Sequence, residues 1–300
     1  MSAAPPLRMR DRTLVPAPGR PLIMGIVNAG PDSFSDAVRL QTLEAQVAHA
    51  RRLVAEGADI IDIGGESGIT YTPATAPGVE IARVVPLVER LVADGVIVSV
   101  DTWKPAVARA ALDAGASMIN DTSGLADLGI AEVCAATGAA LVVMHTRAAP
   151  KRAHFADYRG DVVSDVVEFL ADRCAAARAA GVSAEQIVLD PGPDFAKTPT
   201  ETVDVLRAIE RVAALGRPML LAVSRKYFVG AITGRPPAER LAGTLAAVGW
   251  AADAGAAIVR VHDVAATSDL LRVRRVLAGE EDVPDFDDED DTLKWIRASG

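Results

Sequence analysis

The sequence predicts one α/β domain of the (β/α)8 TIM barrel class. Eight short apolar runs recur along the chain, and each ends in polar residues. Segments with the apolar spacing of amphipathic helices lie between successive runs. In a (β/α)8 barrel the strands surround branched apolar side chains, and active sites lie at the carboxyl ends of the strands. The alternation therefore predicts the fold and also the rim at which a functional site would lie.

The expected strands cover residues 21–27, 59–66, 96–100, 117–119, 141–144, 186–189, 219–223 and 258–262. Their terminal polar residues are Asn28, Asp62 to Glu66, Asp101, Asn120 with Asp121, His145, Asp190, Ser224 with Arg225 and Lys226, and Arg260 with His262. Parallel strands of one barrel end on the same face. These side chains are therefore expected to share one rim.

Helices are expected between the strands. The first follows Thr42, a typical N-cap residue, and ends at Glu56 before Gly57. The second covers residues 79–94, and Pro86 within it predicts a kink or a late helix start. Further helices are expected near residues 105–114, 127–137, 161–180, 200–214, 237–254 and 265–277.

Length and charge set the expected boundaries. The chain has 300 residues, a size that suits one barrel with extensions. We expect a flexible N-terminal segment at 1–20, the barrel at 21–279 and an acidic, disordered tail at 280–300. The tail holds nine acids and two bases, so 31 acids and 29 bases remain elsewhere. A nearly neutral body without a basic stripe argues against nucleic-acid binding.

Composition also predicts a cytoplasmic protein without a membrane partner. No apolar stretch approaches the roughly 20 residues of a membrane span. The N-terminus lacks the apolar region of a secretory signal. The two cysteines, Cys134 and Cys174, fit free thiols in a reducing compartment.

Three strand-end residues predict a site for a flat nitrogen heterocycle. Asp101, Asn120 and Asp190 end the third, fourth and sixth strands. Their carboxylate and carboxamide oxygens accept hydrogen bonds from ring N–H and amino groups. Lys226, near the end of the seventh strand, could meet a ring carbonyl or ring nitrogen. The alternative is that each acid only caps a helix or pairs with an arginine at the rim.

The last strand and the first predict an anion site. Arg260 and His262 are two residues apart, so on a strand they point to the same side, and Asn28 ends the neighbouring strand. Arginine forks onto phosphate oxygens, and histidine adds a donor. A diphosphate with Mg²⁺ is expected, with Asn28 as an oxygen ligand of the metal. The alternative is a rim pair held by a carboxylate such as Asp263.

Other catalytic signatures are weaker in this sequence. His49 and His154 lack metal-ligand spacing, and His145 follows an apolar strand without a second ligand nearby. The sequence holds no G-x-S-x-G elbow, no P-loop and no dinucleotide-binding glycine motif between a strand and a helix.

Seven ordered motifs resemble dihydropteroate synthase. They are NAGPDSFSD, DIIDIGGES, VSVDTWKP, INDTSG, DPGPDFAK, SRK and VRVHDV, and the resemblance covers about residues 22–278. It implies a pterin-binding TIM barrel, usually a homodimer, that acts as a transferase in folate biosynthesis. The family joins 6-hydroxymethyl-7,8-dihydropterin diphosphate to p-aminobenzoate, and the products are 7,8-dihydropteroate and diphosphate.

The resemblance also implies a role for individual residues. The pterin would be held by Asp101, Asn120, Asp190 and Lys226; the diphosphate by Asn28, Arg260 and His262, with Asn28 on Mg²⁺; and p-aminobenzoate by Ser67, Phe195 and Ser224. The catalytic residues would be Asp101, Lys226, Arg260 and His262. Diphosphate would leave first, and the amine of p-aminobenzoate would then attack the pterin cation, so no protein nucleophile is needed.

The sequence departs from the family pattern mainly in its rim loops. After the first strand, Ala29 and Gly30 replace Val and Thr, and after Ser67 the Thr-Arg pair is replaced by Gly68 and Ile69. The sixth-strand motif G-x-G-F-G-K reads Gly192-Pro193-Asp194-Phe195-Ala196-Lys197. Losing the loop arginine removes a charge-assisted contact of roughly 1.5–3 kcal/mol, which Arg147 or Lys151 could replace.

These departures leave three functions open. The first is a working dihydropteroate synthase with divergent loops. The second is a divergent pterin-binding homologue that lacks this activity or uses another acceptor. The third is a folate-binding methyltransferase barrel, which the diphosphate residues disfavour because methyl-folate carries no diphosphate. We expect pterin diphosphate to bind, p-aminobenzoate coupling to be weakened or redirected, and sulfonamides to inhibit poorly.

Overall fold

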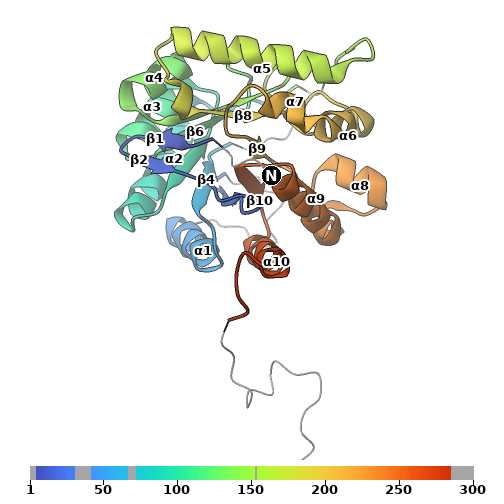
Figure 1. Cartoon of the computed structure of the whole chain (residues 1–300). Coiled ribbons are helices and arrows are strands. Elements are labelled where there is room, and N and C mark those ends of the chain that lie inside the picture. The colour runs from blue at the N-terminus through green and yellow to red at the C-terminus, as the bar shows by residue number, and fades with distance from the viewer. Residues whose placement is uncertain (1–4, 31–41, 67–71, 153, 285–300) are drawn as a thin grey trace, which may run out of the picture.

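A ring of parallel strands surrounded by helices forms the molecule (Figure 1). The computed structural model describes residues 5–30, 42–66, 72–152 and 154–284. Within them, eight strands pair in the order β8-β7-β6-β5-β4-β3-β10-β9. A bridge between Leu189 and Met219 links the two ends of this order. The predicted single-domain (β/α)8 barrel is confirmed.

The strands of the ring coincide with the predicted runs. They are β3 (Leu22–Asn28), β4 (Ile60–Gly64), β5 (Val98–Asp101), β6 (Met118–Asp121), β7 (Ala140–Met144), β8 (Ile187–Asp190), β9 (Leu220–Leu221) and β10 (Ile258–Val261). Neighbouring strands pair in parallel register, so that Asp101 is level with Gly64 of β4 and Asn120 of β6. The polar strand ends therefore lie at one end of the ring.

The helices lie outside the ring. They are α1 (Leu43–Ala55), α2 (Pro77–Ala93), α3 (Pro105–Asp113), α4 (Gly129–Thr137), α5 (Val162–Ala179), α6 (Pro199–Arg207), α7 (Ile209–Ala213), α8 (Tyr227–Thr233), α9 (Leu241–Asp253) and α10 (Val264–Leu277). Thr42 caps α1 as predicted, since its hydroxyl accepts a hydrogen bond from the backbone N–H of Ala45 at 3.2 Å.

Three helices differ from the prediction. α2 begins at Pro77 and continues through Pro86, so of the two expected outcomes, a kink or a late start, the late start is wrong. The helix expected at 200–214 is two helices, because the backbone of Ala208 leaves the helical region between α6 and α7. The short helix α8 was not predicted from the sequence.

Two apolar clusters account for the core. The larger cluster lies between the strands and the helices, and Val27, Ile63 and Val100 are among its fully buried members. The smaller cluster contains the residues that alternate with these on the strands, such as Met24, Ile60 and Met118, and therefore fills the ring. The apolar residues of the strands thus contribute to both clusters.

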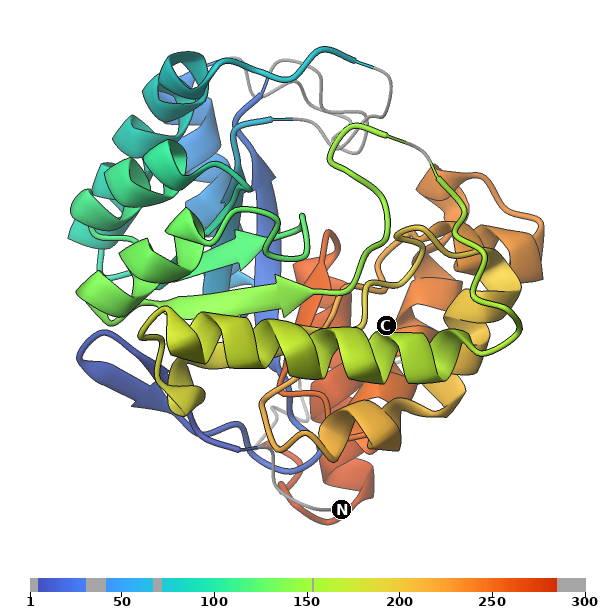
Figure 2. The same cartoon turned by 90° about the horizontal axis from the view of Figure 1, so that it is seen from above.

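An N-terminal hairpin, β1 (Leu7–Met9) and β2 (Arg12–Leu14), corrects one prediction. Leu7 and Met9 are fully buried and belong to the cluster that fills the ring. Arg10 donates from Nε to the carbonyl of Ala116 at 2.7 Å. A flexible segment at 1–20 is therefore wrong for these residues, which lie on the side of the ring opposite to the loops that follow the strands (Figure 2).

The C-terminal segment begins with two paired acids. Glu281 lies 3.0 Å from Nη1 of Arg275 on α10, and Glu280 lies 3.8 Å from Nε of the same arginine. The rest of the predicted acidic tail, 285–300, lies outside the described residues. No helix in the described part of the chain is long and apolar enough to cross a membrane.

Candidate active site

An arginine held by two carboxylates lies at the centre of the rim. Arg260 of β10 donates from Nε to Oδ2 of Asp62 at 2.7 Å and from Nη2 to Oδ2 of Asp101 at 3.1 Å. Asp62 is fully buried on β4, and Asp101 ends β5. The two carboxylates fix the guanidinium across the open end of the ring. Burial lowers the pKa of Arg260, but Asp62 and Asp101 raise it, and the net shift is upward. Sequence reasoning missed this role of Asp62.

Asn120 lies beside this arginine with an unused acceptor. Its Nδ2 donates to Oδ2 of Asp62 at 3.1 Å. Its Oδ1 is buried and has no hydrogen-bond partner in the described structure, and Oδ1 of Asp62 is in the same state. Leaving a buried polar atom without a partner costs roughly 1–3 kcal/mol. Such atoms at a strand end indicate a place for a ligand that donates hydrogen bonds.

Asp101 carries a raised pKa. Burial raises the pKa of its carboxyl to about 7, Arg260 lowers it, and the neighbouring Asp62 raises it again. Its Oδ1 also accepts a hydrogen bond from Oγ1 of Thr122 at 3.3 Å. Near pH 7 the carboxyl of Asp101 is therefore present in both its neutral and its ionised form. The neutral form can donate a hydrogen bond to a ring, and the ionised form can accept one.

The predicted residues of β8 and of the end of β9 are also brought together. Oδ1 of Asp190 accepts from the backbone N–H of Gly192 at 2.7 Å, and burial raises the pKa of this carboxyl. Burial lowers the pKa of Lys226, and the nearby charges of Asp194 and Asp190 oppose this shift. The Nζ of Lys226 lies 4.3 Å from the centre of the Phe195 ring. The lysine and the phenyl ring thus form one wall of the site.

His262 and Ser224 form a pair on neighbouring strands. Nδ1 of His262 lies 2.9 Å from Oγ of Ser224, which also accepts from the backbone N–H of His262 at 3.2 Å. Asp263, the carboxylate considered as an alternative partner of Arg260, instead binds Arg225 at 2.6 Å. Arg260 is held at the rim by a different pair of carboxylates.

Asn28 ends β3 at the same rim, next to Gly64 of β4. A side chain added at Gly64 would lie 3.6 Å from Oδ1 of Asn28, so this oxygen faces the adjoining strand end. Within the described residues, no three His, Cys, Asp or Glu side chains are grouped as metal ligands. A carboxamide oxygen is a hard ligand, and Mg²⁺ commonly takes one or two protein oxygens with the remainder from phosphate and water. The donor set fits a metal carried by a phosphorylated substrate.

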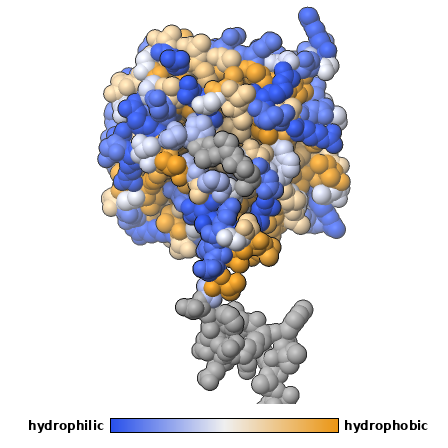
Figure 3. Space-filling model, in the orientation of Figure 1, coloured by the Kyte–Doolittle hydropathy of each residue, from blue (hydrophilic) through white to orange (hydrophobic). Residues whose placement is uncertain are grey.

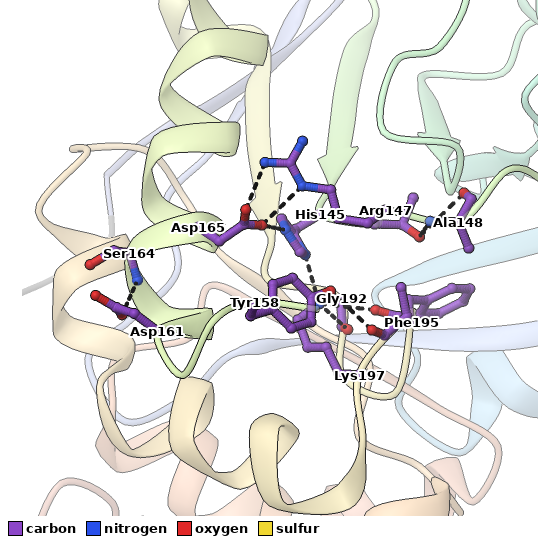
Figure 4. A network of polar contacts seen from close by, with 12 residues as sticks. His145, Arg147, Ala148, Tyr158, Asp161, Ser164, Asp165, Gly192, Phe195 and Lys197 are labelled. Atoms are coloured by element: carbon purple, nitrogen blue, oxygen red, sulfur yellow. Dashed lines mark hydrogen bonds and ion pairs between the residues drawn. The ribbon is translucent and has the colours of Figure 1, made fainter. Parts of the chain in front are cut away.

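Sequence reasoning missed a buried polar network behind the site (Figure 4). Nζ of Lys197 lies 2.7 Å from Nδ1 of His145 and donates to the carbonyls of Gly192 at 2.9 Å and Phe195 at 3.1 Å. Nε2 of His145 lies 2.8 Å from Oδ1 of Asp165 on α5. Burial lowers the pKa of Lys197 to about 7 and that of His145 to about 3. The network fixes the loop that presents Phe195.

Gly192 shows how closely this loop approaches β7. Its φ is +65°, and a Cβ atom there would lie 2.1 Å from the carbonyl oxygen of His145. Only glycine fits such a position. The spacing of His145 and Lys197 gave no sign of their contact, because 52 residues separate them and the fold alone brings them together.

A second cluster of charges joins three rim loops. Nζ of Lys104, after β5, lies 2.5 Å from carboxylate oxygens of both Glu66 and Glu80, and it donates to the carbonyl of Thr75 at 2.7 Å. Nζ of Lys151, after β7, lies 3.3 Å from Glu66. These cations lower the pKa of Glu66 against its burial. Ser67, predicted on the acceptor side, lies outside the described residues.

A cavity of about 280 Å³ lies among these loops. Its described walls include Phe195, Asp194 and Thr122 from the strand ends and Lys151 and Arg152 from the loop after β7. Arg147, considered as a replacement for the missing loop arginine, is not among them. It binds Asp165 through Nε at 3.0 Å and Nη2 at 2.8 Å instead.

Comparison with known proteins identifies the family. The family model described as "Pterin binding enzyme" matches residues 24–262. The dihydropteroate synthase of Bacillus subtilis is 43% identical over 245 residues, 81% of this chain and 84% of that protein. The chain belongs to the dihydropteroate synthase family.

Two further relatives bear on the function of this protein. The Burkholderia cenocepacia dihydropteroate synthase, solved with 7,8-dihydropteroate, is 42% identical, with a TM-score of 0.84 over 93% of this chain and 98% of that one. The inactive dihydropteroate synthase 2 of Mycobacterium leprae is 42% identical over 272 residues, 88% of this chain and 92% of that protein. Membership of the family therefore includes proteins with and without the reaction.

Proposed function

We propose that the protein is a dihydropteroate synthase, a transferase that condenses 6-hydroxymethyl-7,8-dihydropterin diphosphate with p-aminobenzoate. The observation that carries the proposal is Arg260, which Asp62 and Asp101 hold next to the unpartnered oxygen of Asn120. A cation beside unpartnered hydrogen-bond acceptors supports the proposal, because the cation suits a leaving diphosphate and the acceptors suit a pterin. A methyltransferase acting on a folate without diphosphate would have no use for that cation.

The pterin is assigned to Asp101, Asn120, Asp190 and Lys226. The two carboxyls and the carboxamide offer acceptors for ring N–H and amino groups, and the ammonium of Lys226 offers donors for a ring carbonyl or nitrogen. Asp101 and Asn120 lie at the ends of the adjacent strands β5 and β6, Asp190 ends β8, and Lys226 precedes α8. The four residues share one rim, which supports contact with a single planar ring. The buried setting strengthens each of these hydrogen bonds relative to water.

The diphosphate is assigned to Asn28, Arg260 and His262. Arg260 has a fixed orientation, so it loses little freedom when it stabilises the charge that grows on the leaving oxygen. Asn28 would hold Mg²⁺, which when bound supplies positive charge to the diphosphate. Departure of diphosphate leaves a pterin cation that an ionised Asp101 stabilises. The amine of p-aminobenzoate then attacks, held on the side of Phe195, Ser224 and Ser67.

Release of diphosphate tests the proposal. Purified protein with Mg²⁺, the pterin diphosphate and p-aminobenzoate should form dihydropteroate and release an equal amount of diphosphate. Arg260→Lys keeps the charge but loses the fork to Asp62 and Asp101, and it should lower kcat by roughly 10²–10³. Arg272→Lys, on the exposed side of α10, is the matched control. Tight binding of the pterin without any product would favour the divergent, inactive homologue.

Homodimer formation and a cytoplasmic location are further proposals. Val273 and Leu277 of α10 are exposed, as is Val283 after it, and Figure 3 shows apolar surface where the described chain leaves the barrel. Pairing of two copies would cover such surface. Sedimentation would test the dimer. Cys134 and Cys174 are free thiols, which suits a reducing compartment.

A further inference from the structure

Asp194 has a backbone conformation that favours glycine. Its φ is +64°, in the left-handed region. Non-glycine residues in this region are uncommon, and strain of this kind collects at functional sites. Thr202 stabilises the turn, because its Oγ1 accepts from the backbone N–H of Asp194 at 3.0 Å and donates to its Oδ1 at 3.2 Å.

The carboxylate of Asp194 is bound at the start of α8. The backbone N–H of Tyr227 donates to its Oδ2, and that of Phe228 lies 3.3 Å from both carboxylate oxygens. Lys226, the N-cap residue of α8, makes no side-chain capping bond. Asp194 therefore caps a helix from another element, which by itself would be a structural role.

Asp194 is also one of the residues that line the 280 Å³ cavity. Among the described wall residues, Asp194 is the one acid, and the basic side chains are Lys151, Arg152 and His154, all on the loop after β7. The ammonium of Lys151 is already close to Glu66. In the described structure, no ion pair or hydrogen bond of the Arg152 guanidinium is present. The cavity thus has a negative wall beside Phe195 and a positive wall on the loop after β7.

We propose that Asp194 is a specificity-determining residue that sets the electrostatic polarity of the acceptor cavity. Its fixed charge opposes a carboxylate near the start of α8, so the carboxylate of the acceptor is directed to Arg152. This assignment rests on the proposed function, because it concerns the second substrate of that reaction. The acceptor class follows: aromatic amines are admitted, and a negative charge on them is tolerated only at the Arg152 side.

Physical chemistry favours this over simple capping. The N–H groups that begin α8 and the ammonium of Lys226 would otherwise attract an anion. With Asp194 in place they already have one, and a second carboxylate brought to the same place meets a like charge at short range. An uncharged acceptor does not meet this opposition.

Two charge-removing variants test the proposal with a matched pair of acceptors. Asp194→Asn keeps an oxygen that can cap α8 but removes the charge. The acceptors are p-aminobenzoate and its uncharged amide, p-aminobenzamide. We expect Asp194→Asn to lower KM for p-aminobenzoate roughly three- to tenfold and to leave KM for the amide unchanged. Arg152→Gln should raise KM for p-aminobenzoate by a similar factor, again without an effect on the amide.

The controls separate charge from structure. Asp204→Asn, on the exposed face of α6, removes one negative charge away from the cavity and should change neither KM. Equal effects of Asp194→Asn on both acceptors, or no effect on either, would overturn the proposal and leave Asp194 as a helix cap. Failure of the reaction itself is distinguishable. If the native protein turns over neither acceptor, their dissociation constants with pterin and diphosphate bound still report the same charge preference.

Discussion

Asp101 is the residue whose ionisation should control pterin binding. Burial and Asp62 raise the pKa of its carboxyl to about 7, while Arg260 opposes the shift. An ionised carboxylate accepts hydrogen bonds from a ring through both oxygens, whereas a protonated carboxyl uses one oxygen as an O–H donor. The folded-state pKa exceeds the ordinary value, so ionising this group costs stability as pH rises through about 7, and ligand contacts can return part of that cost.

Pterin affinity should therefore rise with pH from 6 to 8. We expect roughly a tenfold gain, because one pH unit changes the ionised fraction of an acid near its pKa by up to that factor. Calorimetric titration with the pterin diphosphate at both pH values measures it. Asp62→Asn removes the neighbouring charge and should move the rise to lower pH. The same slope in Asp101→Asn would assign the titration to another group.

Lys197 makes an opposite contribution to stability. Burial lowers its pKa to about 7, so between pH 7 and about 10 the unfolded chain binds more protons than the folded protein. Unfolding free energy should rise with pH in this interval. Lys197→Met, which keeps the volume, should flatten the rise measured by urea unfolding at pH 7.5 and 9.5. An unchanged slope would show that Lys197 stays charged next to His145.

At the scale of elements, the hairpin β1–β2 is a plug for the barrel rather than an appendage. Met9 is fully buried in the cluster that fills the ring, and Arg8 donates to Oγ of Ser183 at 2.8 Å. These two contacts form only when the hairpin folds together with the barrel. Its two short strands could not be stable on their own.

Shortening a buried side chain of the hairpin should destabilise the whole protein. Met9→Ala removes buried methylenes and leaves a cavity, so we expect a loss of about 2–5 kcal/mol in unfolding free energy. Val15→Ala, at a side chain that is 66% exposed, is the control and should cost less than about 0.5 kcal/mol. Chemical denaturation measures both. A loss confined to the control range would mean that the hairpin detaches without affecting the barrel.

At the scale of the whole molecule, the proposed acceptor site lies among loops that follow different strands. Lys104 after β5 and Lys151 after β7 both reach Glu66 after β4. Arg147 is taken by Asp165. The charge lost with the loop arginine at Ile69 is therefore not restored by Arg147, and Lys151 is shared with Glu66 and Thr72.

Sulfonamides should consequently inhibit poorly, because they occupy the place of p-aminobenzoate. Ile69→Arg should strengthen the binding of both sulfonamides and p-aminobenzoate by roughly 10- to 100-fold, because a charge-assisted contact contributes about 1.5–3 kcal/mol. Inhibition constants measured for a sulfonamide before and after the change test this. Strong inhibition of the native protein would show that the altered loop is immaterial, and Ile69→Gln controls for loss of the apolar side chain.

The sequence by itself determined the barrel and the membership of its rim. Alternating apolar runs and polar strand ends are local patterns, so they located the ring strands and the residues Asn28, Asp101, Asn120, Asp190, Lys226, Arg260 and His262. The hairpin was missed because its strands are three residues long, and α8 because its cap, Asp194, comes from 33 residues earlier. Periodicity cannot reveal either feature.

The tertiary structure decided how these residues are paired. Arg260 and Asp62 are 198 residues apart in sequence, yet barrel closure brings them within 2.7 Å. Lys197 meets His145 in the same way. Partner choice, burial and the direction of each pKa shift depend on distances that closure sets, and no local pattern encodes them. Asp194 and Arg152, which are 42 residues apart in sequence but line the same cavity, are a further case.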